Sequence, residues 1–86
     1  IESNAIAAYL RGLAGVGEIH DLHIWGMSTT ECALTVHLVM PGGYPGDKFM
    51  DDVMCELKTR FSVHHSTLQI EQGTTDHACM LHPAGA

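Results

Sequence analysis

The residues of this chain that can do chemistry gather in one strand-like stretch and in the apolar segment that follows it. Residues 18–26 read Glu-Ile-His-Asp-Leu-His-Ile-Trp-Gly and contain His20, Asp21 and His23, and a further histidine, His37, lies in the next segment. Neutral imidazole is the most common metal-ligating side chain. Imidazoles combined with a carboxylate suit Zn²⁺, Co²⁺ or another first-row ion. This stretch therefore predicts a metal site.

The pairing of the two strands decides which of these side chains meet. A pairing in which residue numbers add up to 58 places Ile24 opposite Leu34 and keeps the apolar side chains on one face. Because a buried face fixes the register of a strand, we prefer this pairing. The other face then shows Asp21 opposite His37, with His23 diagonal to His37. Directly paired Cβ atoms lie about 5 Å apart, which is close enough to share one ion.

A third strand, expected over residues 64–72, adds Glu71 to the same face, with His65 or Gln69 as further candidates. His20 has the wrong strand parity for this cluster. It sits near the start of its strand, however, where twist or a bulge would redirect it. The alternative interpretation is that these histidines are surface residues on a half-solvated sheet.

The C-terminal tail carries a second candidate site. Residues 73–86 contain His77, Cys79 and His82, three ligands within six residues. A flexible segment can adapt such ligands to tetrahedral geometry, and a fourth ligand would come from the sheet or from a partner chain. The alternative is that these residues are incidental. We expect residues 1–72 to form a metal-binding dimerisation domain, with residues 73–86 as its tail.

The elements that position these residues follow the order αββαβ. The middle strand is expected to be central, with the first strand antiparallel and the third parallel to it, because a strand–helix–strand crossover places its strands parallel. This is an α+β fold, a ferredoxin-like open-faced sandwich that lacks one strand. Its three-stranded mixed sheet carries both helices on one face. Helices are expected over 4–14 and 47–61, with Asp47 as the N-cap of the second, and strands over 16–27, 31–40 and 64–72.

Composition narrows the class of function. The chain has 86 residues and a net charge of −6, which argues against a nucleic-acid partner. Its three cysteines show no paired spacing, so a disulfide framework is not expected. Neither a membrane-spanning apolar run nor a signal peptide is visible. The chain opens without an initiator Met, and we expect an excised domain whose membrane portion lies outside it. No phosphate loop or nucleophile motif is present, so we expect no enzymatic activity.

Two segments carry a resemblance to a known family. Residues 16–26, with their HDLHIW string, and residues 34–40, with a histidine in mid-strand, resemble the C-terminal cytosolic domain of the cation diffusion facilitators. Within that family the segments are most similar to bacterial cobalt–zinc–cadmium resistance exporters. With the order of the helices, the resemblance covers residues 3–72.

The resemblance implies a function and a ligand set. Family members are dimeric, proton-coupled exporters of divalent metals, and metal binding to the cytosolic domain is thought to draw two copies together. The family's ligands match His20, His37, Asp47 and Glu71 of this chain, with Gly73 where a further ligand is expected. Asp47 and Glu71 stand where the family pattern has histidines, although carboxylates also ligate metals. Related members use tail cysteines, which favours Cys79.

The leading hypothesis is therefore a metal-binding, dimerising regulatory domain of a divalent metal exporter, with zinc, cobalt or cadmium as the ion. Its partners would be a second copy and the membrane domain of the same full-length chain, on the cytoplasmic side of the bacterial inner membrane. A soluble metallochaperone-like module and a purely structural dimerisation domain are the alternatives. Strand parity favours His23 as the ligand from the first strand, whereas the resemblance favours His20, and the sequence leaves this choice open.

Overall fold

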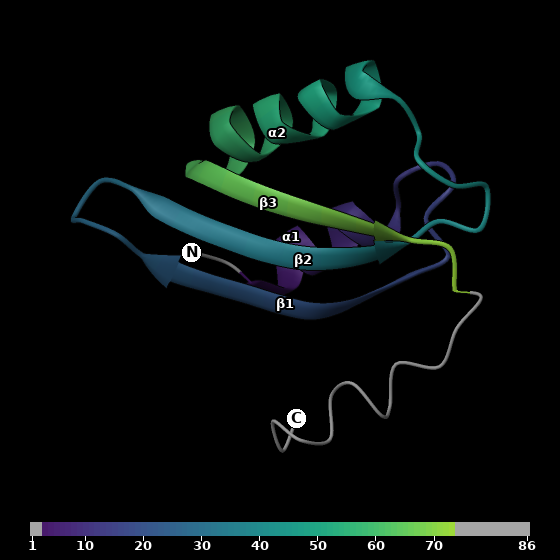
Figure 1. The fold of residues 1–86 in the computed structure, drawn as a ribbon. Helices are drawn as coiled ribbons and strands as arrows, with labels where there is room; N and C mark the ends of the chain where they lie inside the picture. Colours follow the sequence, from purple (N-terminus) through teal and green to yellow (C-terminus); the bar gives the residue numbers. More distant parts are fainter. Residues whose placement is uncertain (1–2, 74–86) are drawn as a thin grey trace.

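The computed structural model describes residues 3–73 and confirms the expected order of elements (Figure 1). The elements are α1 (Ser3–Arg11), β1 (Glu18–Gly26), β2 (Cys32–Val39), α2 (Asp47–Phe61) and β3 (Val63–Glu71). The three strands form one sheet in the order β1-β2-β3, in which β1 pairs antiparallel with β2, and β2 pairs parallel with β3. The α+β fold with a mixed three-stranded sheet is therefore as predicted.

Both helices pack against the same face of the sheet, because the apolar side chains of β2 alternate toward them. Figure 1 shows α2 beside β3 and α1 behind the sheet. One core joins α1, β2 and α2, and burial of such side chains supplies most of the stabilisation of a small domain. The fully buried side chains are Ile6, Leu10, Leu34, Val36, Leu38, Val53, Leu57 and Val63. The opposite, open face of the sheet is left for polar side chains.

α2 spans the expected residues 47–61, whereas the end of α1 and the N-cap of α2 differ from prediction. α1 ends at Arg11 rather than at residue 14, because Gly12 is a poor helix former and the chain tightens there, with Leu13 N–H donating to the Leu10 carbonyl at 3.2 Å. Gly15, with φ of 88°, then reverses the chain. Asp47 is not the N-cap of α2, since Gly46 occupies that position with φ of 105°. Asp47 is instead the first helical residue.

The first strand contains a β-bulge, the feature named above as a way for His20 to join the cluster, although the uniform register lacked it. From His23 to Gly26 the paired residue numbers add up to 58, as in the pair His23–Thr35. From Glu18 to His20 they add up to 57, as in the pair His20–His37. One extra residue therefore lies in β1 between the two segments. It is Asp21, whose φ of 54° places it in the left-handed region, a conformation that aspartate tolerates better than most residues.

The bulge corrects the prediction that Asp21 lies directly opposite His37. His20 takes that place, since paired residues of antiparallel strands share a face. His20 was placed on the other face by counting alternate residues along a regular strand. The count fails because the bulge inserts one extra residue. No helix within residues 3–73 is long and apolar enough to cross a membrane.

Candidate metal centre

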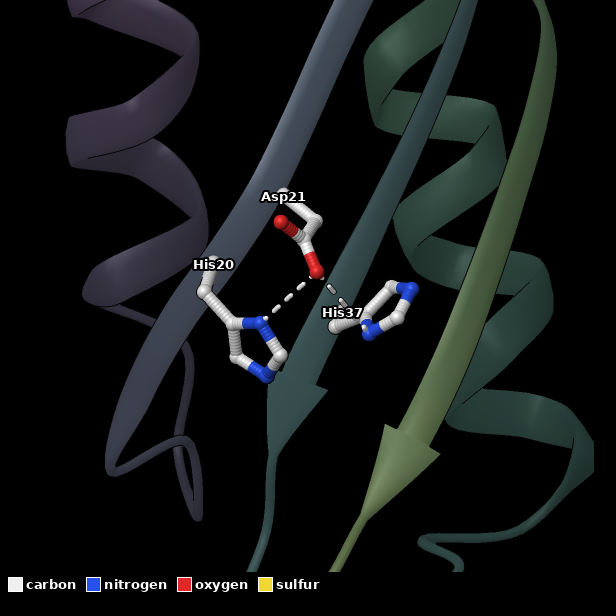
Figure 2. Close-up of side chains that lie close together, drawn as sticks. All are labelled: His20, Asp21 and His37. Carbon is white, nitrogen blue, oxygen red and sulfur yellow. Dashed lines mark hydrogen bonds and ion pairs between the residues drawn. The ribbon is translucent and has the colours of Figure 1, made fainter. Parts of the chain in front are cut away.

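Three ligand-bearing side chains meet on the open face, two from β1 and one from β2. Figure 2 shows His20, Asp21 and His37 pointing toward one another. Asp21 Oδ2 lies 3.1 Å from His20 Nδ1 and 3.7 Å from His37 Nδ1. One ligand atom from each residue lies within 4.8 Å of the others. The two imidazoles approach edge to face, with ring centroids 4.8 Å apart.

The spacing of these atoms fits a metal ion. Ligands that lie 2.0–2.1 Å from a tetrahedral ion are separated from one another by about 3.3 Å. The distances from Asp21 Oδ2 to the two imidazole nitrogens, 3.1 and 3.7 Å, lie on either side of this value. All three ligand atoms lie within 4.8 Å of one another, so side-chain movement alone would bring them around one ion. The donor set of imidazoles and carboxylate suits Zn²⁺ or Co²⁺.

Glu71 of β3 contacts both imidazoles of the cluster. Its Oε1 accepts a hydrogen bond from His20 Nε2 at 2.7 Å, and its Oε2 accepts one from His37 Nδ1 at 2.6 Å. The amide of Gln69 also donates to Oε2, at 3.3 Å. The Glu71 side chain is only 7 % exposed, whereas that of Asp21 is 38 % exposed. The cluster thus has one buried and one solvent-facing carboxylate.

Sheet register explains why a glutamate is suited to this position. Glu71 pairs with Val39, and Gln69 pairs with His37. Glu71 therefore lies one pleat beyond His37 on the same face, since side chains of one face recur every two residues. Its side chain is long enough to lean back over β2 and reach His37 as well as His20.

The cluster shifts the acid–base properties of two of its members. The hydrogen bond from His20 to Glu71 is the main cause that raises the pKa of His20 above its ordinary value of 6.5, against the opposing effect of burial. Burial disfavours ionisation of Glu71, but the hydrogen bonds from His20 and His37 together outweigh it and lower the pKa of the carboxyl below 4.5. The hydrogen bond to the buried carboxylate therefore favours the protonated form of His20.

Comparison with known proteins places this geometry in context. Residues 1–73 match the family described as "Cation efflux protein, cytoplasmic domain". The chain belongs to this family. The match confirms the predicted resemblance to the C-terminal cytosolic domain of cation diffusion facilitators.

Full-length relatives are much longer than this cytoplasmic domain. The chain is 32 % identical over 65 residues to the metal cation efflux system protein CzcD of Cupriavidus metallidurans, covering 74 % of this chain and 21 % of that protein. It is 29 % identical over 72 residues to metal tolerance protein 1 of Oryza sativa subsp. japonica, covering 84 % and 17 %. The chain thus spans about a fifth of the length of these two relatives.

A solved structure shares the fold. The metal-bound C-terminal domain of the CzcD transporter superposes with a TM-score of 0.72 at 26 % sequence identity. The match covers 83 % of this chain and 99 % of that domain. This chain therefore has the same architecture and nearly the same size as the CzcD domain, which is described in a metal-bound form.

Other predicted ligands of this cytoplasmic domain lie outside the three-residue group. His23 lies on the open face opposite Thr35 and is exposed. The Asp47 carboxylate accepts a hydrogen bond from the Tyr44 hydroxyl at the start of α2. His65 lies 3.1 Å from Glu31, near the hairpin end of the sheet. Within residues 3–73 only His20, Asp21 and His37 form a group of three with metal-ligand spacing. The tail candidates His77, Cys79 and His82 lie outside the described residues.

The sequence did contain a signal for the bulge. On both sides of Asp21 the residues alternate regularly between core and open face, with Ile19 and His20 before it and Leu22 and His23 after it. Asp21 is the one residue that interrupts this alternation. Aspartate is also one of the few residues other than glycine that are enriched in the left-handed region. A register that allowed one insertion at Asp21 would have placed His20 correctly.

Proposed function

We propose that this chain is the cytosolic regulatory domain of a proton-coupled divalent metal efflux transporter and that it binds zinc, cobalt or cadmium on the open face of its sheet. Four residues, His20, Asp21, His37 and Glu71, hold the ion. The observation that carries the proposal is the spacing of Asp21 Oδ2 from the two imidazoles, 3.1 and 3.7 Å, which suits a bound ion. Family membership, with relatives named as zinc transporters and cation efflux proteins, supports it.

The ion would act on the assembly rather than on a chemical reaction. A ligand shifts a conformational equilibrium only through its different affinities for the two states. We infer that the chain forms a homodimer in which metal favours the transport-competent arrangement of the membrane domain of the same full-length chain, on the cytoplasmic side of a bacterial inner membrane. The half-exposed Trp25, on the open face at 47 % exposure, supports a second copy as the cover for part of this face. The domain is not an enzyme in this proposal.

The tail would supply further ligands to the same region. Gly73 follows Glu71 by two residues, and His77 lies four residues beyond Gly73. An extended chain covers at most about 3.3–3.6 Å per residue, so His77 and Cys79 have the reach to approach the sheet cluster. A thiolate at this site would increase its affinity for a soft ion such as cadmium.

Calorimetric titration of the metal-free chain with Zn²⁺ tests the proposal. We expect tight binding to the wild type and at least about a tenfold loss of affinity in His37→Ala, because an imidazole ligand is removed. His64→Ala is the matched control, since His64 is exposed and lies outside the group of three. Equal affinity in the wild type and His37→Ala would rule out the sheet cluster as the site.

Light scattering with and without a chelator separates the regulatory role from its alternatives. A shift in the monomer–dimer equilibrium on addition of Zn²⁺ is the expected result. A dimer that ignores both chelator and Zn²⁺ would indicate a purely structural dimerisation domain. A metal-binding monomer under all conditions would instead indicate a soluble metallochaperone-like module.

A further inference from the structure

We propose that Asp21 is an inserted residue whose β-bulge delivers a solvent-facing carboxylate ligand to the metal site, at the expense of the stability of the metal-free fold. This inference rests on the proposed metal-binding function and assigns a specific role to the one irregularity of the sheet. It predicts that stability and metal affinity respond in opposite directions to changes at a single position.

The pairing on either side of Asp21 identifies it as an insertion. His20 pairs with His37 and His23 pairs with Thr35, so two residues of β1 face the single residue Val36 between these pairs. Without Asp21, the order Ile-His-Leu-His-Ile-Trp would alternate without interruption between the core and the open face. The sheet therefore does not need this residue in order to pair β1 with β2 or to place His20 and His23 on the open face.

The backbone of Asp21 is strained relative to a regular strand. Its φ of 54° is one of two positive values among the described non-glycine residues, the other being Ser62 with 61°. At Ser62 the conformation has an evident use, because the Ser62 N–H caps the last carbonyls of α2, those of Leu57 and Lys58. Strain in a strand more often marks a functional site, where the rest of the fold maintains it.

At Asp21 the strained conformation has a use as well, because it places a carboxylate beside two imidazoles. The bulge places Oδ2 3.1 Å from His20 Nδ1 and 3.7 Å from His37 Nδ1. Removing Asp21 would leave two imidazoles and one carboxylate, Glu71, which is nearly buried. Asp21 adds a second negative charge to the ligand set, so the two carboxylates together balance a divalent cation. It also gives the ion a ligand that faces solvent.

Three variants separate the bulge from the carboxylate. Asp21→Asn keeps a residue that tolerates the left-handed region but removes the charge. Asp21→Gly keeps the bulge, relieves the strain and removes the carboxylate. Deletion of Asp21 restores a regular strand. Ser62→Gly is the matched control, since it relieves the same type of backbone strain away from the site.

Each variant of the 86-residue chain is measured twice at one protomer concentration. Thermal unfolding in the presence of a chelator gives the Tm of the metal-free fold, and calorimetric titration with Zn²⁺ gives the affinity. We expect Asp21→Gly and Ser62→Gly each to raise the Tm by roughly 2–4 °C. The deletion should leave the Tm no lower than that of the wild type. All three Asp21 variants should lose Zn²⁺ affinity by at least about tenfold, whereas Ser62→Gly should bind as the wild type does.

The outcomes also separate this inference from the proposed function. If the Asp21 variants bind Zn²⁺ with wild-type affinity while His37→Ala does not, the site exists but the role of Asp21 is wrong. A clear fall in metal-free Tm for both the glycine and the deletion variants would likewise overturn the inference, because the bulge would then be needed for the fold. If His37→Ala binds as the wild type does, the proposed function itself fails.

Discussion

His20 and Glu71 are hydrogen-bonded at 2.7 Å although they belong to the two edge strands of the sheet. The central strand, β2, lies between them, and their side chains meet above it on the open face. His37 of β2 binds the other oxygen of the same carboxylate at 2.6 Å. One buried carboxylate thus joins all three strands at the point where the ion is proposed to bind. In the absence of metal, hydrogen bonds from the two imidazoles to Glu71 hold the site in place, and metal binding must rearrange these hydrogen bonds.

The stability of the metal-free fold should fall both when the pH rises and when it falls. The folded-state pKa of His20 is raised above 6.5, so its contribution is complete below that pH and is lost as the pH rises through the folded pKa. The folded-state pKa of Glu71 is lowered below 4.5, so its contribution is present above that pH and is lost as the pH falls through the folded pKa. We therefore expect the cluster to contribute most between about pH 4.5 and 6.5. Urea unfolding of the wild type and His20→Gln measures this, and an equally steep alkaline fall in the variant would contradict it.

Metal affinity should rise with pH across the same region. The ion and the protons compete for the imidazole nitrogens, and the raised pKa of His20 means that a proton must leave before it ligates. Calorimetric titration with Zn²⁺ in buffers of different ionisation enthalpy, between pH 6 and 8, counts the protons released. Binding without proton release at pH 6 would show that His20 is not a ligand.

Replacement of Glu71 should weaken both the fold and the site. Glu71→Ala leaves His20 and His37 without their shared acceptor, which should cost about 1–2 kcal/mol of metal-free stability, given that both imidazoles are partly exposed. Glu71→Gln keeps the size and an acceptor and should cost less stability, yet still lose Zn²⁺ affinity. Thr67→Ala, at an exposed residue of the same strand that pairs with Thr35, serves as the control. Comparable losses in Thr67→Ala would indicate a general effect of polar side chains on β3.

The two histidines of β1 should behave differently. His20→Ala should lower Zn²⁺ affinity by at least about tenfold, because His20 lies opposite His37 in the cluster. His23→Ala should leave affinity within experimental error, since His23 pairs with Thr35 and lies outside the group of three. Calorimetric titration of the two variants side by side decides the question. The reverse order of effects would mean that the ion binds further along the strand.

A soft ion should reveal the contribution of the tail. If Cys79 supplies a thiolate, Cys79→Ser should reduce the affinity for Cd²⁺ more than that for Zn²⁺, because thiolates favour the softer ion. Competition titrations with the two ions, using the wild type and a chain truncated after Gly73, give the comparison. Identical Cd²⁺ affinity in all three proteins would remove His77, Cys79 and His82 from the ligand set.

Much of the fold could be predicted from local patterns. The apolar alternation of residues 32–40 and the helical period of Met50, Val53 and Leu57 indicated β2 and α2 within a residue or two. The crossover rule then placed β2 in the centre of the sheet. The end of α1 and the N-cap of α2 were less accessible, because Gly12 and Gly46 occupy these positions through backbone conformation. Such endpoints depend on φ values that residue type only biases.

The sequence by itself determined the fold class, the open face and the residue types that could bind a metal. It identified His37 by two independent lines, since both the register and the family resemblance select it. Only the tertiary structure decided between His20 and His23, because a single inserted residue changes the register of half a strand. Only the tertiary structure brought Glu71 to both imidazoles, since Glu71 is 51 residues from His20 and 34 residues from His37 in the chain. The alternation of side chains along a strand is a local property of the sequence. The position of a bulge and the direction of a buried carboxylate depend on the assembled sheet.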